Sequence, residues 1–255
     1  MNLKFDLSVA EGYTSKSQIA RVLTEKWVSQ NIFCPSCGNE ILKEFANNSP
    51  VADFFCDDCK SEYELKSKKD SKSLKIVDGA YSTMIERINS DNNPNFFFLN
   101  YDSKNLIVKN FLVIPKYYFI DDIIEIRKPL KPTARRAGWV GCNILLSGIP
   151  ESGKIHFIKN NVALERTEIL AAWNKTEFLS KQKKSNRGWT IEVMKLLDKI
   201  KDRDFYLKEI YKFENTLREK FPNNNFVKDK IRQQLQILRD KNIIEFLGNG
   251  HYRKI

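Results

Sequence analysis

The sequence predicts a mixed α/β domain followed by a C-terminal winged-helix domain. In the mixed domain we expect a sheet flanked by helices, with a four-cysteine zinc site embedded in it. Strand-like segments rich in aromatic and β-branched residues alternate there with amphipathic helical segments, and three helical segments and a hairpin then close the chain. We place the domains at residues 1–183 and 184–255, near a lysine-rich polar stretch, 176–186, that is expected to be a linker.

Charge favours a nucleic-acid-binding protein. Of the 255 residues, 43 are Lys or Arg and 32 are Asp or Glu, giving a formal net charge of +11. A strongly basic protein usually meets a polyanion, although a lysine-rich surface that only maintains solubility is the alternative. Residues 183–255 hold 18 Lys and Arg against 10 acids. A second basic group has no acid between its ends and consists of Arg127, Lys128, Lys131, Arg135 and Arg136.

Signals for a membrane or exported protein are not found in the sequence. No apolar run approaches the ~20 residues of a membrane span. The first residues also lack the apolar stretch of a signal peptide. A cytoplasmic protein is therefore expected.

Four cysteines form two pairs that predict a zinc site. Cys34 and Cys37 enclose two residues, as do Cys56 and Cys59, and 18 residues separate the pairs. This spacing is typical of structural zinc sites with four thiolate ligands. Two disulfides are the alternative, but nothing in the sequence indicates export to an oxidising compartment. Because four thiolates leave no open position for a substrate, the zinc is expected to be structural.

Two acids and a lysine lie in strand-like segments on either side of the second cysteine pair. Asp53 belongs to the segment 50–55, while Glu64 and Lys66 project from one face of the segment 63–68. If the second cysteine pair is the tip of a hairpin, Asp53 folds back beside Glu64. The sequence therefore predicts that zinc holds these three side chains in one cluster.

That cluster suits phosphodiester hydrolysis. Asp53 and Glu64 supply hard oxygen ligands for Mg²⁺, and the backbone carbonyl of Leu65 is a third candidate oxygen. Such an ion would polarise the scissile phosphate and lower the pKa of an attacking water. Lys66 would position that water and stabilise charge in the transition state. The alternative is a solvated strand face with mixed charges.

Further elements complete the first domain. Helices are expected at 17–31 and 78–90, and core strands at 95–101 and 106–113. Within a basic loop, Arg135 and Arg136 would contact phosphates. Trp139 would stack on a base or insert beside one, unless it packs in the core instead.

The C-terminal part predicts a winged helix. Helices are expected at 189–200, 207–221 and 226–241, and a hairpin at 243–254 that turns at Gly248-Asn249-Gly250. The third helix of such a domain enters the major groove.

Five polar side chains are candidate DNA contacts of this domain. Arg232, Gln233 and Gln236 lie away from the apolar stripe of the third helix, and their chemistry suits base edges. Arg253 and Lys254 on the hairpin suit phosphates. A protein-binding surface or a merely solvated helix face is the alternative.

Some of these motifs resemble known nucleases. Pro50, Asp53 and the run 64–66 are similar to the PD-(D/E)xK nuclease core, except that two residues separate Pro50 from Asp53. Longer blocks resemble the DpnI family of methyl-directed restriction endonucleases. They span nearly the whole chain and lie at 64–69, 91–99, 132–139 and 230–241.

The resemblance implies a Mg²⁺-dependent monomeric enzyme. It would cut both DNA strands at GATC when the adenine carries an N6-methyl group. In PD-(D/E)xK nucleases an acid on the first core helix can join the metal ligands, which makes Glu25 a candidate beside the simpler interpretation of a solvated residue. Reading a methyl group needs a snug apolar contact, for which Trp139 and Trp189 are candidates.

Two other functions remain open at this point. A zinc-containing winged-helix transcription regulator would bind DNA without cutting it, and would have no need of Asp53, Glu64 and Lys66. A repair or structure-specific nuclease would use the same core without recognising methylation.

Overall fold

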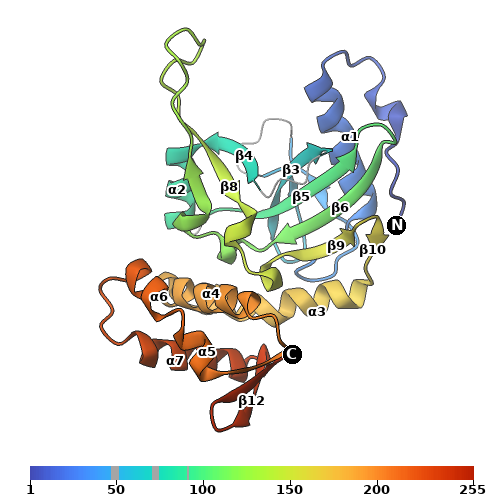
Figure 1. The fold of residues 1–255 in the computed structure, drawn as a ribbon. Coiled ribbons are helices and arrows are strands. Elements are labelled where there is room, and N and C mark those ends of the chain that lie inside the picture. Colours follow the sequence, from blue (N-terminus) through green and yellow to red (C-terminus); the bar gives the residue numbers. More distant parts are fainter. Residues whose placement is uncertain (47–51, 71–74, 91) are drawn as a thin grey trace. The chain divides into compact units, whose positions relative to one another are not determined.

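The computed structural model describes residues 1–46, 52–70, 75–90 and 92–255. Pro50 of the nuclease-like motif therefore lies outside the described residues, as does Asp91 of the second block. The chain divides into two compact units (Figure 1). The first comprises 1–147 and 152–174, and the second comprises 148–151 and 175–255. None of the described helices has both the length and the apolarity to span a bilayer.

A mixed seven-stranded sheet forms the centre of the first unit, as predicted. Its strands follow the order β1-β2-β3-β5-β6-β9-β10. The pair β3–β5 is parallel, and all the other neighbours in this sheet are antiparallel. The strands are β1 (Lys43–Glu44), β2 (Phe54–Phe55), β3 (Glu62–Lys69), β5 (Asn95–Asp102), β6 (Ile107–Ile114), β9 (Ile155–Lys159) and β10 (Val162–Ala163).

A second, three-stranded antiparallel sheet lies in the same unit, in the order β4-β8-β7. It consists of β4 (Lys75–Ala80), β8 (Gly141–Leu145) and β7 (Ile124–Ile126), and α2 (Tyr81–Asn89) contacts all three strands. The predicted helix at 78–90 is wrong at its start, because Asp78 lies on β4 opposite Cys142. Residues 75–80 form a strand because their backbone pairs with β8, which is distant in sequence.

One face of the large sheet carries an aromatic core. Helices α1 (Lys16–Asn31) and α3 (Arg166–Thr176) contribute to it, and α3 was not predicted. Trp27 of α1 meets Phe111 of β6 edge to face at 5.5 Å. Phe97 of β5 stacks on Tyr63 of β3 at 4.5 Å with an interplanar angle of 6°.

The opposite face of the sheet holds the predicted catalytic side chains. In the β3–β5 register, Glu64 lies opposite Phe96 and Lys66 opposite Phe98. Because side chains alternate along a strand, these residues point away from the face of Phe97. Glu64 and Lys66 therefore share one face, as predicted.

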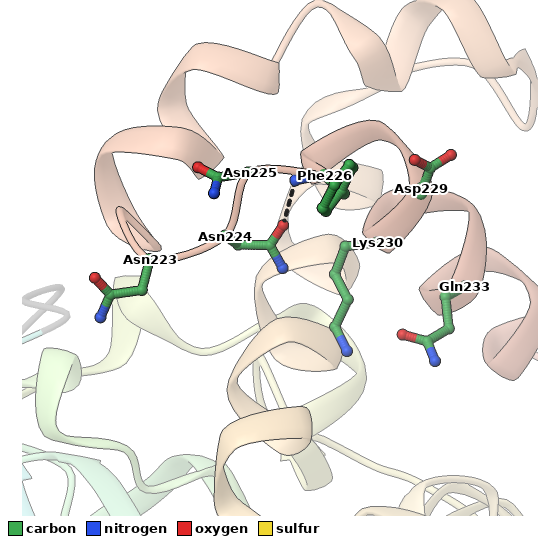
Figure 2. A pocket seen from close by; sticks show the side chains of 7 residues that line it. All are labelled: Asn223, Asn224, Asn225, Phe226, Asp229, Lys230 and Gln233. Carbon is green, nitrogen blue, oxygen red and sulfur yellow. Dashed lines mark hydrogen bonds between the residues drawn. The ribbon is translucent and has the colours of Figure 1, made fainter.

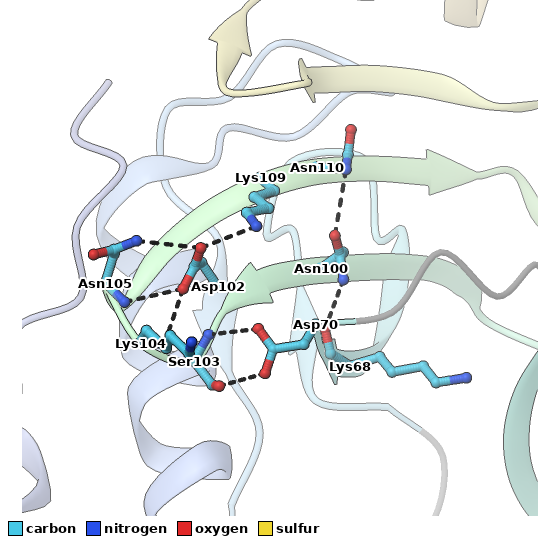
Figure 3. A network of polar contacts seen from close by, with 9 residues as sticks. All are labelled: Lys68, Asp70, Asn100, Asp102, Ser103, Lys104, Asn105, Lys109 and Asn110. Carbon is cyan, nitrogen blue, oxygen red and sulfur yellow. Dashed lines mark hydrogen bonds and ion pairs between the residues drawn. The ribbon is translucent and has the colours of Figure 1, made fainter.

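A polar network closes the turn between β5 and β6 (Figure 3). The Asp102 carboxylate accepts hydrogen bonds from the backbone N–H groups of Lys104 and Asn105 and lies 2.9 Å from the Lys109 ammonium. These hydrogen bonds, from the backbone above all, lower the pKa of Asp102 below its usual range. The Asp70 carboxylate, just after β3, also accepts a hydrogen bond from the Ser103 N–H at 2.9 Å, so the network ties this turn to the end of β3.

The second unit contains helices α4 (Lys184–Lys199), α5 (Leu207–Tyr211), α6 (Glu214–Lys220) and α7 (Val227–Asp240). The prediction of a single helix at 207–221 is wrong, because the helix is interrupted between α5 and α6. A small sheet, in the order β11-β13-β12, contains the predicted hairpin of β12 (Ile244–Gly248) and β13 (His251–Lys254). Strand β11 (Asp204–Tyr206) was not predicted.

The hairpin turns at the predicted residues, whereas the segment expected to be a linker is folded. Gly248, Asn249 and Gly250 all have positive φ, as a tight hairpin turn requires. The predicted linker at 176–186 is largely helical: it contains the end of α3, a 3₁₀ turn at Glu177–Lys181 and the start of α4. Leu179 in that turn is fully buried, so the segment is part of the packed structure.

Removing the ring of Phe97 should strongly destabilise the first unit. Phe97 is fully buried and also contacts the rings of Phe111 and Phe157. We expect Phe97→Ala to lower the free energy of unfolding by about 3–5 kcal/mol, measured by denaturant unfolding. The exposed Val162 gives the control, and Val162→Ala should change it by less than about 0.5 kcal/mol. Equal effects of the two variants would contradict this account of the core.

Candidate functional site

The four cysteines come together as predicted. Their Sγ atoms all lie within 4.8 Å of one another. Cys34 is 3.5 Å from Cys59, and Cys37 is 3.6 Å from Cys56. A tetrahedral site with Zn–S bonds of about 2.3 Å requires sulfur atoms about 3.8 Å apart. The cluster could therefore hold a zinc ion.

Two similar turns build this cluster. The Gly38 N–H donates to the Cys34 carbonyl at 2.8 Å, and the Lys60 N–H donates to the Cys56 carbonyl at 3.0 Å. Both closing residues have positive φ, 83° at Gly38 and 58° at Lys60. The second turn joins β2 to β3, so the cluster forms the tip of a hairpin, as expected.

Tyr63 links the cysteine cluster to β3. Its hydroxyl lies 3.1 Å from the Cys34 sulfur, and its ring is fully buried. Hydrogen bonds to ligand atoms orient the ligands of a metal site. This contact was not predicted, because the cysteine spacing that indicates a zinc site says nothing about a tyrosine on the following strand.

Asp53, Glu64 and Lys66 meet in one cluster. The Asp53 N–H donates to the Tyr63 carbonyl at 3.0 Å, and the Asp53 carboxylate accepts a hydrogen bond from the Leu65 N–H at 2.6 Å. The Lys66 ammonium lies 2.5 Å from the Glu64 carboxylate. The side chains of Glu64 and Lys66 are each 20% exposed, so this ion pair is largely shielded from water.

A further acid, Asp78 of β4, joins them. Its Oδ1 lies 2.5 Å from the Lys66 Nζ, and its side chain is only 4% exposed. Asp78 was missed because the sequence places it at the start of a helix. No spacing rule relates it to Lys66, since only the fold of the second sheet brings the two together.

Burial and mutual charge shift the pKa values in this cluster. Burial raises the pKa of Glu64; the Lys66 ammonium partly offsets the rise, and Asp78 and Asp53 add to it. Burial likewise raises the pKa of Asp53, against the hydrogen bond from Leu65. For Lys66, burial alone would lower the pKa, but the carboxylates of Glu64 and Asp78 outweigh burial and the pKa is raised. Lys66 therefore stays an ammonium.

Glu25 of α1 lies close enough to feel the same charges. Burial raises its pKa to about 6, Arg21 at 3.7 Å partly offsets the rise, and the Asp53 carboxylate adds to it. Glu25 is therefore a further acid near Asp53. Its role as a metal ligand stays a prediction.

The basic loop forms an arm between β7 and β8. The Gly138 N–H donates to the Leu130 carbonyl and the Leu130 N–H to the Trp139 carbonyl, both at 3.0 Å. Figure 1 shows this green segment extending away from the strands that carry it. Arg135 and Arg136 are exposed on it. The arm presents both arginines to solvent, as phosphate contacts require.

In the second unit, Arg232, Gln233 and Gln236 are exposed on α7, while Ile231, Leu235 and their apolar neighbours are buried. Gln233 lines a pocket of about 490 Å³, drawn in Figure 2. Arg232 and Gln236 line a second pocket, of about 390 Å³, beside the hairpin. The first pocket is lined by Asn223, Asn224, Asn225, Phe226, Asp229, Lys230 and Gln233.

The asparagines of that pocket do not cap α7, whose N-cap residue is Phe226. Instead the Asn224 side chain accepts a hydrogen bond from the Phe226 N–H at 2.8 Å (Figure 2). This bond shapes the turn before α7, where Phe226 is 73% exposed.

The two basic residues of the hairpin have partners inside the unit. Arg253 makes a two-pronged pair with Asp204 of β11, at 2.8 and 2.9 Å. The Lys254 ammonium donates to the carbonyls of Leu197 and Ile200, at 3.3 and 2.6 Å, at the end of α4. Both side chains thus stabilise the small domain, and their contact with phosphates stays a prediction.

Family models match nearly the whole chain. The DpnI, or Dam-replacing, family matches residues 1–182, and the Dam-replacing helix-turn-helix domain matches residues 185–254. This chain belongs to the DpnI family. Membership implies a methylation-dependent restriction endonuclease that binds DNA. It confirms the resemblance stated from the sequence.

The two tryptophans of this DpnI-family protein that are candidates for contact with the methyl group differ in burial. Trp189 is 6% exposed and stacks on Phe221 at 4.0 Å, so its ring belongs to the core of the second unit. Trp139 is half-buried, and the Arg136 guanidinium lies 4.5 Å above its ring. Of the two, Trp139 is the more exposed, and its contact with a methyl group stays a prediction.

The cysteine cluster of this DpnI-family protein should bind one zinc ion per chain. We expect Cys37→Ser to lose the metal and to unfold the β2–β3 hairpin, since structural zinc can contribute on the order of 10–16 kcal/mol of apparent folding free energy. Metal analysis and circular dichroism measure both effects. The buried Cys142, which is not one of the four, gives the control, and Cys142→Ala should keep the zinc. A Cys37→Ser protein with full zinc content would rule out the site.

Proposed function

We propose that this protein is a Mg²⁺-dependent endonuclease that cuts both DNA strands at GATC sites carrying N6-methyladenine. Asp53, Glu64 and Lys66 are the proposed catalytic residues, in a PD-(D/E)xK domain over 1–183. The main support is their meeting in one shielded cluster, in a chain of a restriction-endonuclease family. The GATC specificity rests on the family resemblance alone.

The donor set fits a magnesium ion. Asp53, Glu64 and the Leu65 carbonyl offer hard oxygens, which Mg²⁺ prefers. Burial makes the isolated carboxylates resist ionisation, as their raised pKa values indicate, and a divalent cation would reverse this. When bound, the ion would polarise the scissile phosphate and lower the pKa of the attacking water.

Lys66 acts as a cation rather than as a base in this mechanism. Its pKa is raised by the carboxylates around it, so it holds its proton at neutral pH. A fixed ammonium beside the reacting phosphate stabilises the negative charge that develops in the transition state. It also orients the attacking water by donating a hydrogen bond.

Two regions are proposed to bind DNA. In the catalytic domain, Arg135 and Arg136 of the arm contact phosphates and Trp139 stacks beside a base. In the winged-helix domain, 184–255, α7 enters the major groove and reads bases with the exposed residues described above. We propose that the protein acts as a monomer.

Plasmid cleavage tests the proposed activity. With Mg²⁺, the protein should cut plasmid that is adenine-methylated at GATC and leave the unmethylated plasmid intact. Lys66→Ala should lower the rate at least 10²-fold while duplex affinity in Ca²⁺ is retained, as seen by gel shift. If neither plasmid is cut, the protein is a DNA-binding regulator; if both are cut equally, it is a nuclease indifferent to methylation. Normal cutting by Lys66→Ala would remove the active-site assignment.

The two kinds of DNA contact should respond differently to mutation. Gln233→Ala should cost about 1–3 kcal/mol on the cognate duplex and relax specificity at one base pair. Arg135→Ala should weaken all duplexes alike and reduce the salt slope of log affinity by about one. Fluorescence anisotropy in Ca²⁺ measures both, and the exposed Lys104, in the β5–β6 turn, gives the control Lys104→Ala. A uniform loss with Gln233→Ala would move that residue to the backbone contacts.

A further inference from the structure

Lys66 is held by two acids from different sheets. Glu64 of β3 lies two residues before it, and Asp78 of β4 reaches it from the three-stranded sheet. Both carboxylates are 2.5 Å from the ammonium, yet their surroundings differ. Glu64 is 20% exposed, whereas Asp78 is 4% exposed.

The Glu64 carboxylate would attract the Lys66 ammonium less strongly once it binds a cation. If Glu64 held a divalent ion, the ion would offset the negative charge of the carboxylate and would repel the ammonium beside it. A lysine with no other anion would then move away from the reacting phosphate. Asp78 is the acid that can keep the ammonium in place, because its own carboxylate stays outside the metal ligands.

The surroundings of Asp78 argue against its being a metal ligand. Its Oδ1 already accepts hydrogen bonds from the Lys66 ammonium and, at 2.7 Å, from the Gly79 N–H. Its Oδ2 is buried and has no hydrogen-bond partner among the residues that the structure describes. Mg²⁺ usually keeps several waters, which an oxygen closed to solvent cannot accommodate.

We propose that Asp78 is a positioning residue for catalysis: it holds the Lys66 ammonium at the scissile phosphate while Glu64 is engaged by the metal. The proposal rests on the proposed nuclease function. It assigns a role to a β4 residue that lies outside the PD-(D/E)xK motif. The three-stranded sheet thereby becomes part of the catalytic apparatus.

Asp78→Asn tests this role with little change of shape. Asparagine keeps one oxygen for the Lys66 and Gly79 hydrogen bonds, removes the negative charge, and places an amide NH₂ where the buried Oδ2 was. We expect the single-turnover cleavage rate to fall about 10–100-fold, as for other residues that orient a catalytic group. The affinities for methylated duplex and, by calorimetry, for Ca²⁺ should stay within about threefold. Asp102→Asn is the matched control, since it also removes a carboxylate paired with a lysine and should cut at the wild-type rate.

A double mutant shows whether Asp78 acts through Lys66. If it does, Asp78→Asn should change the residual rate of Lys66→Met by less than about twofold, because residues that act as a unit are not additive. Zinc content and melting curves identify a common temperature at which all variants are folded, and the rates are compared there.

Each remaining outcome overturns a specific claim. Undiminished cutting by Asp78→Asn, with active wild type, overturns the role of Asp78 and leaves the nuclease function intact. A Ca²⁺ affinity lowered more than tenfold makes Asp78 a metal ligand instead. Additive losses in the double mutant exclude an effect through Lys66. A wild type that cuts no methylated DNA removes the proposed function and this proposal together.

Discussion

The candidate site depends on the antiparallel pairing of β2 with β3. Phe54 lies opposite Tyr63, so Asp53, just before β2, reaches the Leu65 N–H. A slip of one residue would turn every β3 side chain to the other face of the sheet, because strand side chains alternate. The cysteine cluster holds the register from one end, since its second pair forms the turn between the strands and Tyr63 contacts the Cys34 sulfur. A cysteine cluster that could hold zinc thus fixes the geometry of the proposed catalytic site.

The buried acids of the site oppose folding. Glu64 and Asp53 are shielded from water and close to each other, and their raised pKa values report the free energy needed to ionise them there. Such clusters persist only where the rest of the structure holds them. Here the opposite face of the same sheet provides that support through its stacked rings, Phe97 on Tyr63 above all. Rigid packing on one face permits concentrated charge on the other.

The sequence predicted local features and missed those made by distant pairing. The cysteine spacing and the alternation from Glu64 to Lys66 predicted the cluster and its face, because both depend on neighbours along the chain. Asp78 could not be predicted, because β4 pairs with β8, more than sixty residues later, and only that pairing brings it to Lys66. Strand β11 was missed for the same reason, since its partner is the last strand of the chain. Local patterns fix which side chains share an element, and the tertiary fold decides which elements share a site.

The net charge of a domain also predicts phosphate binding less precisely than the placement of each charged side chain does. Arg253 and Lys254 add two positive charges to the C-terminal domain. Arg253, however, donates its hydrogen bonds to Asp204, and Lys254 donates to the carbonyls at the end of α4. Arg135 and Arg136, by contrast, lie exposed on the arm, and within the described part of the chain neither side chain has a carboxylate partner. A phosphate must displace an existing acceptor in the first case and only water in the second. Because counterion release favours charges that are free to meet phosphates, we expect the arm to contribute more to the proposed DNA binding than its share of the total charge suggests.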